Sequence, residues 1–206
     1  EGDVLERSHF VNPNSLTKKY IENANKNKIS LPVRLHDFKE IYEEFEIDNY
    51  EFHLSYKEVL EKELNIKNYP SNAKFSIHLP DYIDSTKLID PFSNDNYTLN
   101  MSRKILDKVI NFASDLQQKN GVLVPVVGSF SICDREKESF YEDCKNLIDK
   151  YLKKNCNLYP QWLPPIAWYF GGSVVLNIFN SNDDVSWLKH FSIPICLDVC
   201  HFGMCF

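Results

Sequence analysis

Several features that would point to common function classes are missing from this chain of 206 residues. No stretch approaches the roughly 20 consecutive apolar residues that span a bilayer, and residues 1–6 lack the basic and then apolar pattern of a signal peptide. No GxGxxG or GxxxxGK(S/T) motif follows any predicted strand, so nucleotide-binding open sheets lose support. The sequence therefore predicts a soluble, cytoplasmic protein without a membrane partner.

Basic patches and close cysteine pairs are also lacking. The formal net charge is −6, and the lysines are scattered among acidic residues without forming a stripe that could neutralise phosphates. Nucleic acid is therefore not expected as a partner. The six cysteines form no CxxC pair and fall in helix-like stretches or beside an apolar run, which favours reduced core thiols over disulfides.

The apolar content is sufficient for one domain. Hydrophobic residues make up 43% of the chain and aromatic residues 14%, which is enough for one sizeable core. Residues 1–30 are polar and are predicted to be a linker or lead-in with one short helix at 16–24, and residues 31–206 to form the domain. Because the chain begins with Glu1 rather than Met, we expect it to belong to a larger polypeptide.

From Leu31 onward, short apolar runs alternate with stretches of helical periodicity. Residues 162–180, rich in Pro, Gly and aromatics, resemble an elaborated loop over a barrel mouth. Alternating strands and helices imply parallel pairing through right-handed crossovers, and an α/β TIM-type (β/α) barrel is favoured, with about six of its eight units present. Strands are predicted at 31–35, 50–54, 74–79, 122–127, 157–161 and 193–198, and helices at 38–45, 56–64, 100–118, 137–153 and 185–190.

Histidines and a carboxylate follow the predicted strands, where barrels carry their active residues. His36, His53 and His78 lie in or after the first three strands, and Asp198 with His201 ends the last. Imidazole and carboxylate from separate strands suit zinc or manganese. The alternative reading is that Asp198 caps the next helix and that the histidines are structural.

Three segments of the sequence resemble a known superfamily. ICLDVCHF (residues 195–202) is similar to the LDxxH strand and turn of the xylose isomerase-like barrels, which include sugar phosphate isomerases and epimerases and endonuclease IV-type repair enzymes. FSIHLPD (75–81) and EFHLS (51–55) are similar to earlier strands of the same superfamily. A narrower resemblance, in VRLHDF, EFHLSYKE and LPPIAWYFGGS, points to the domain attached to some bacterial sialic acid (nonulosonate) synthase proteins.

The resemblance implies roles for particular residues. Asp198 and His201 would be metal ligands, and His78 would be the catalytic imidazole that transfers a proton. Gln161 stands where the superfamily usually has a glutamate, and the last strand, which usually donates another glutamate, would lie beyond Phe206. A neutral amide lacks the charge of a carboxylate, so the divalent metal, zinc or manganese, is expected to bind weakly or not at all.

A sugar or sugar phosphate is the small-molecule partner that the resemblance implies, and His53, Gln161, Trp168 and Arg34 are the candidate substrate-binding residues. The Trp168 ring could pack on a sugar or could close one end of the barrel. Arg34 could bind a phosphate or carboxylate, or could be an ordinary surface residue.

Three functions follow from these readings. The first is a sugar (phosphate) isomerase or epimerase in carbohydrate metabolism, with bacterial surface-glycan or sialic acid-type sugar synthesis as the context. The second is a non-catalytic carbohydrate-binding or assembly module of a larger synthase, which Gln161 favours. The third, a repair enzyme of the endonuclease IV type, is disfavoured by the acidic charge balance.

Overall fold

The computed structural model describes residues 21–205 except 24, 46, 131–135 and 170–171, and most of the helix predicted at 16–24 lies outside these residues. The elements and their bounds are β1 (Leu31–Val33), α2 (Phe38–Glu44), β2 (Asn49–His53), α3 (Tyr56–Glu61), η1 (Ile66–Asn68), β3 (Lys74–His78), α4 (Asn96–Asn120), β4 (Val126–Gly128), α5 (Lys137–Leu152), β5 (Leu158–Pro160), β6 (Ile166–Tyr169), β7 (Gly172–Val175), α6 (Asn182–His190) and α7 (Val199–Cys205).

Five strands form one parallel sheet in the order β1-β2-β3-β4-β5. Beyond β5, Cys196 forms a parallel bridge with Gln161 and occupies a sixth strand position. Two hydrogen bonds hold this bridge, from the Cys196 amide to the Pro160 carbonyl (2.8 Å) and from the Trp162 amide to the Cys196 carbonyl (2.9 Å). Sequential parallel strands joined by helices are the arrangement of an incomplete TIM-type barrel, so the predicted fold class is confirmed.

The two faces of the sheet differ in chemistry because successive side chains of a strand point to opposite sides. Tyr50, Phe52 and Phe75 are buried on the outer face, where the Phe38 ring of α2 packs against all three. His53 and His78 are direct neighbours on the opposite, inner face. The outer face is therefore the hydrophobic core, and the inner face of β2 and β3 is polar.

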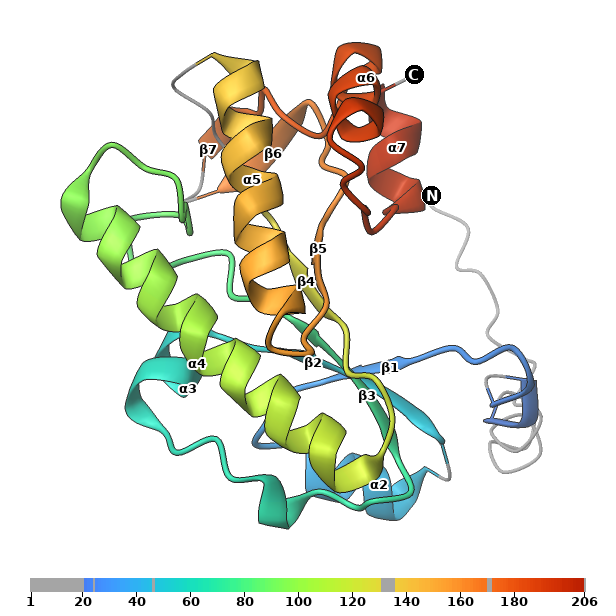
Figure 1. Cartoon of the computed structure of the whole chain (residues 1–206). Coiled ribbons are helices and arrows are strands. Elements are labelled where there is room, and N and C mark those ends of the chain that lie inside the picture. The colour runs from blue at the N-terminus through green and yellow to red at the C-terminus, as the bar shows by residue number, and fades with distance from the viewer. Residues whose placement is uncertain (1–20, 24, 46, 131–135, 170–171, 206) are drawn as a thin grey trace, which may run out of the picture.

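Figure 1 shows how the helices are placed around the strands. The C-terminal end of α5 meets the middle of α4, where Tyr151 and Lys150 approach Asp107. The β6–β7 hairpin and helices α6 and α7 lie at the end of the molecule toward which β4 and β5 lead. Asp95 caps the N-terminus of α4, because its side chain accepts a hydrogen bond from the Thr98 amide. Gly121 caps the C-terminus and adopts a left-handed φ of 66°. Within the described residues, no helix has the length and apolar character needed to cross a membrane.

Three predicted elements differ from the structure. The apolar run 122–127 forms a strand only from Val126, because Val122 and Leu123 follow the end of α4 and are exposed. The strand predicted at 193–198 is reduced to the Cys196 bridge, since it has a neighbour on one side only. The loop predicted over residues 162–180 contains the antiparallel hairpin β6–β7.

The cysteines of the described residues are free thiols, as predicted, and Cys133 lies outside that part of the chain. Cys144 and Cys156 belong to the hydrophobic core. Burial raises the pKa of the Cys144 thiol and raises that of Cys156 to about 11, so both are protonated and unreactive at neutral pH.

A fully buried carboxylate, Asp184, joins α5 to α6. It accepts hydrogen bonds from the Lys137 ammonium (2.8 Å), the Tyr141 hydroxyl (2.9 Å) and the Ser181 hydroxyl (2.6 Å), and it completes a capping box with Ser181. Burial by itself opposes ionisation of Asp184, but the hydrogen bonds from Lys137, Ser181 and the Asn180 amide outweigh it and lower its pKa. The carboxylate therefore stabilises the fold in its charged form.

Replacing Asp184 with Asn should lower the free energy of unfolding by about 3 kcal/mol, because the buried partners lose their charge complement. A group whose folded pKa is depressed stabilises the protein above its unfolded pKa, so the wild-type advantage should be lost as the pH falls below about 4. Urea denaturation at neutral and acidic pH measures both effects. The matched control is Asp183→Asn, since Asp183 is exposed and its removal should cost less than about 1 kcal/mol; equal losses in the two variants would contradict the assignment.

Candidate functional site

A pocket of about 490 Å³ lies at the carboxyl ends of the parallel strands. Its polar lining comes from β2, β3, the segments after β3, β4 and β5, and α7, and its apolar lining comes mainly from residues 163–167. The segment before and within the hairpin thus covers the barrel mouth, as the sequence predicted. We call this cavity the mouth pocket, and its lining residues are His53, His78, Asp81, Ser129, Gln161, Leu163, Pro164, Ile166, Ala167, His201 and Met204.

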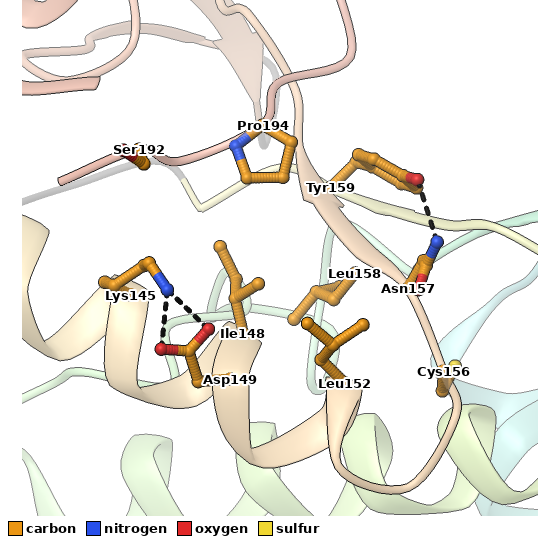
Figure 2. A pocket seen from close by; sticks show the side chains of 10 residues that line it. All are labelled: Lys145, Ile148, Asp149, Leu152, Cys156, Asn157, Leu158, Tyr159, Ser192 and Pro194. Carbon is orange, nitrogen blue, oxygen red and sulfur yellow. Dashed lines mark hydrogen bonds and ion pairs between the residues drawn. The ribbon is translucent and has the colours of Figure 1, made fainter. Parts of the chain in front are cut away.

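A second crevice, of about 330 Å³, lies at the opposite end of β5. Figure 2 shows that apolar side chains from α5 and β5, Ile148, Leu152 and Leu158, face one another there, and that Lys145 pairs with Asp149 on the helix surface. Because barrel enzymes place their chemistry at the carboxyl ends of the strands, this crevice is not the candidate active site.

A charged and polar layer begins on β2 and β3. The His53 Nε2 atom lies 2.7 Å from the Glu51 carboxylate, and the Ser76 hydroxyl donates a hydrogen bond to the same carboxylate at 3.2 Å. The hydrogen bond from His53 is the main cause that lowers the pKa of Glu51, against the effect of its burial. The His53 ring also stacks on the His78 ring, with centroids 5.0 Å apart.

Gln161 connects this layer to the rest of the mouth. Its side-chain oxygen lies 3.0 Å from the His78 Nε2 atom and accepts a hydrogen bond from the Ser129 hydroxyl at 2.9 Å. Its side-chain nitrogen donates to the Asp198 carboxylate at 3.1 Å. The other ring nitrogen of His78 lies 2.8 Å from the Leu79 carbonyl oxygen, so both nitrogens of this predicted catalytic residue are engaged within the protein.

The two predicted metal ligands, Asp198 and His201, are adjacent, with Nδ1 of the imidazole 3.4 Å from a carboxylate oxygen. Asp198 also accepts a hydrogen bond from the His201 amide (2.9 Å), the position of a helix N-cap for α7, as the alternative reading of the sequence predicted. The His201 Nδ1 atom donates to the Trp162 carbonyl (3.0 Å), so the lone pair of a neutral ring lies on Nε2. His201 lines the mouth pocket, whereas Asp198 is not among the lining residues.

This arrangement does not fit a divalent metal. Both oxygens of Asp198 are occupied by N–H donors, and Nε2 of His78 faces an amide oxygen. Among the described residues, no three His, Cys, Asp or Glu side chains are grouped so that they could hold a metal ion. A zinc or manganese site therefore needs a rearrangement of these hydrogen bonds.

The remaining predicted substrate-binding residues are placed differently. Arg34 is exposed and donates a hydrogen bond to the His53 carbonyl, so it lies next to β2 but does not line the mouth pocket. The backbone of Trp168 belongs to β6, and its side chain lies outside the described part of the structure. Asp81 lines the pocket although the sequence analysis gave it no role, and its place directly after the third strand is the signal that could have identified it.

No protein-family model matches this chain, and no curated protein matches it. Among solved structures, the crystal structure of SacUVDE is similar, with a TM-score of 0.50 and 16% sequence identity. The alignment covers 94% of this chain and 64% of that chain, so this chain spans less than two thirds of the longer protein. At this identity the likeness shows the fold alone.

Replacing Gln161 with Glu should destabilise the protein at alkaline pH, because the amide donor to Asp198 becomes a second carboxylate about 3 Å away. Two carboxylates this close cannot both ionise easily, so the pKa of one is raised and the loss of stability should shrink as the pH is lowered. We expect a loss of about 2 kcal/mol at alkaline pH, from urea denaturation. The control is Gln118→Glu on the exposed side of α4; a loss in Gln161→Glu that does not change with pH would contradict the network.

Proposed function

We propose that the mouth pocket binds a small carbohydrate and that this barrel serves as a sugar-recognition module in carbohydrate metabolism. The observation that carries the proposal is the lining of the pocket, where polar side chains from several strands meet an apolar wall formed by residues 163–167. A few placed polar groups beside an apolar surface are typical of small-molecule sites. Sugars match such a lining because they carry hydroxyls on one face and C–H groups on another.

The hydrogen bonds among the polar side chains favour sugar binding without a metal. The Gln161 side chain links His78, Ser129 and Asp198, and each Asp198 oxygen already accepts a hydrogen bond from an N–H group of the protein. The bacterial surface-glycan or sialic acid-type context, and membership of a larger polypeptide, remain part of the proposal through the resemblance of VRLHDF, EFHLSYKE and LPPIAWYFGGS.

Isothermal titration calorimetry against neutral hexoses, amino sugars and sialic-type sugars and their precursors tests the proposal. We expect at least one of these sugars to bind, and His201→Ala to weaken that binding about tenfold through loss of one hydrogen bond in the pocket. The control is His190→Ala on the exposed surface of α6, which should leave binding unchanged. Absence of binding to every sugar, with the fold intact by circular dichroism, would refute the proposal.

A second candidate function is a sugar isomerase or epimerase with zinc or manganese. The observation that favours it is the orientation of His201, whose Nε2 atom is free of described hydrogen bonds and belongs to a ring that lines the pocket beside Asp198. Mass spectrometry of the purified protein and NMR assays of sugar turnover distinguish the two functions. Bound metal, and turnover abolished in Asp198→Asn, would favour the enzyme; no metal and unchanged turnover would exclude this mechanism.

A further inference from the structure

The described side chains of the mouth pocket use most of their hydrogen-bond donors within the protein. His201 donates through Nδ1 to the Trp162 carbonyl, and His53 donates through Nε2 to the ionised Glu51 carboxylate. A neutral imidazole has one donor and one acceptor nitrogen, so each of these rings has its acceptor left for a ligand. Both ring nitrogens of His78 face oxygen atoms of the protein, so neither is available to accept a hydrogen bond from a ligand.

Gln161 offers few hydrogen-bond donors to a ligand. Its oxygen is shared by His78 and Ser129, and one amide N–H is directed at Asp198. At most one further amide N–H is available to a ligand. The pocket thus presents acceptor nitrogens and oxygens from separate strands to whatever binds there, and a ligand that fits it has to supply the donors.

Asp81 adds a negative charge to this excess of hydrogen-bond acceptors. The residue lines the mouth pocket, in the loop after β3, and its carboxylate has no hydrogen bond or ion pair with any described residue. Its neighbours in the chain do have such partners: Asp84 is bound by the Thr86 amide and by Lys87 through its amide. Among the described residues, Asp81 is therefore a carboxylate at a ligand site that no lysine or arginine neutralises.

The lysines and arginines that could offset Asp81 are engaged elsewhere or absent from the described lining. That lining contains no Lys or Arg. Arg34 donates to the His53 carbonyl outside the pocket, and Lys137 is committed to Asp184. A phosphate or carboxylate group would meet acceptor atoms and a negative charge, and like charges at such distances disfavour binding.

We infer that the mouth pocket selects a sugar with an ammonium group, with Asp81 as its anionic contact, and that it rejects phosphorylated and carboxylated sugars. The sialic acid-type context then concerns precursors without a carboxylate and not the sialic acids themselves. The inference rests on the proposed carbohydrate-binding function and names its ligand class. The ammonium group pairs with Asp81, and the sugar hydroxyls donate to Nε2 of His201 and Nδ1 of His53. Neutral sugars bind through the same hydroxyls without the ion pair.

The experiment is a titration of the whole chain at neutral pH with four matched probes: glucosamine, glucose, phosphorylated glucose and glucuronate. Affinity is measured by calorimetry, and the imidazole resonances of His53 and His201 are followed by NMR to locate the site. Glucosamine should bind about fivefold more tightly than glucose, as expected for one partly exposed ion pair. The two anionic sugars should bind more weakly than glucose.

Asp81→Asn removes the charge and keeps the shape of the side chain. It should abolish the preference for glucosamine over glucose and relieve the rejection of phosphorylated glucose. The control is Asp115→Asn on the exposed face of α4, which changes the net charge equally but should leave the selectivity unchanged.

Each other outcome has a distinct meaning. If sugars bind but phosphorylated glucose binds as tightly as glucosamine, the inferred selectivity is wrong and the proposed function stands. The same holds if inorganic phosphate shifts the His53 and His201 resonances more than glucosamine does. If none of the four sugars binds but another sugar of the wider calorimetry panel does, the inference fails and the proposed function stands; if no sugar of that panel binds, both fail.

Discussion

The side-chain amide of Gln161 is the contact on which the barrel mouth depends. It lies after β5 and reaches the residues that end β3, β4 and the sixth strand position, which are His78, Ser129 and Asp198. A side-chain amide can accept from Ser129 through its oxygen while it donates to the Asp198 carboxylate through its nitrogen. A glutamate at this position would instead repel Asp198. With glutamine the mouth is held together by hydrogen bonds, whereas with glutamate it would need a cation between the two carboxylates.

The inner face of β2 and β3 departs from the usual barrel interior, which is packed with branched apolar side chains. Here the inner face carries Glu51, His53, Ser76 and His78, while the aromatic side chains of the two strands, Tyr50, Phe52 and Phe75, lie on the outer face. The polar side chains satisfy one another through the Glu51 carboxylate and the stacked imidazoles. The apolar outer face therefore stabilises the fold. The polar inner face contributes less to stability, so its side chains can be chosen for contacts with a ligand.

The sequence was most informative where periodicity was strong. The alternation in β2 and β3 and the apolar faces of α4 and α5 were sufficient to predict these elements and, with them, the parallel order that brings His53, His78 and Gln161 to one end. Apolar content alone failed in residues 122–127 and 193–198, because a strand requires a paired neighbour that local sequence does not encode. Asp81 was missed although its place after the third strand is a signal, because only the three-dimensional structure shows that its carboxylate has no partner among the described residues.

Helix α7 has no buried residue, although it carries His201 into the mouth pocket. It is attached by the Asp198 cap, the bond from His201 to the Trp162 carbonyl, the contact of Phe202 with the Trp162 ring and the Cys205 thiol on the Leu163 carbonyl. An element with so little core contact opens locally at a small free-energy cost. A ligand that binds the pocket and contacts His201 would therefore slow hydrogen exchange in this helix, because binding and local opening are thermodynamically linked.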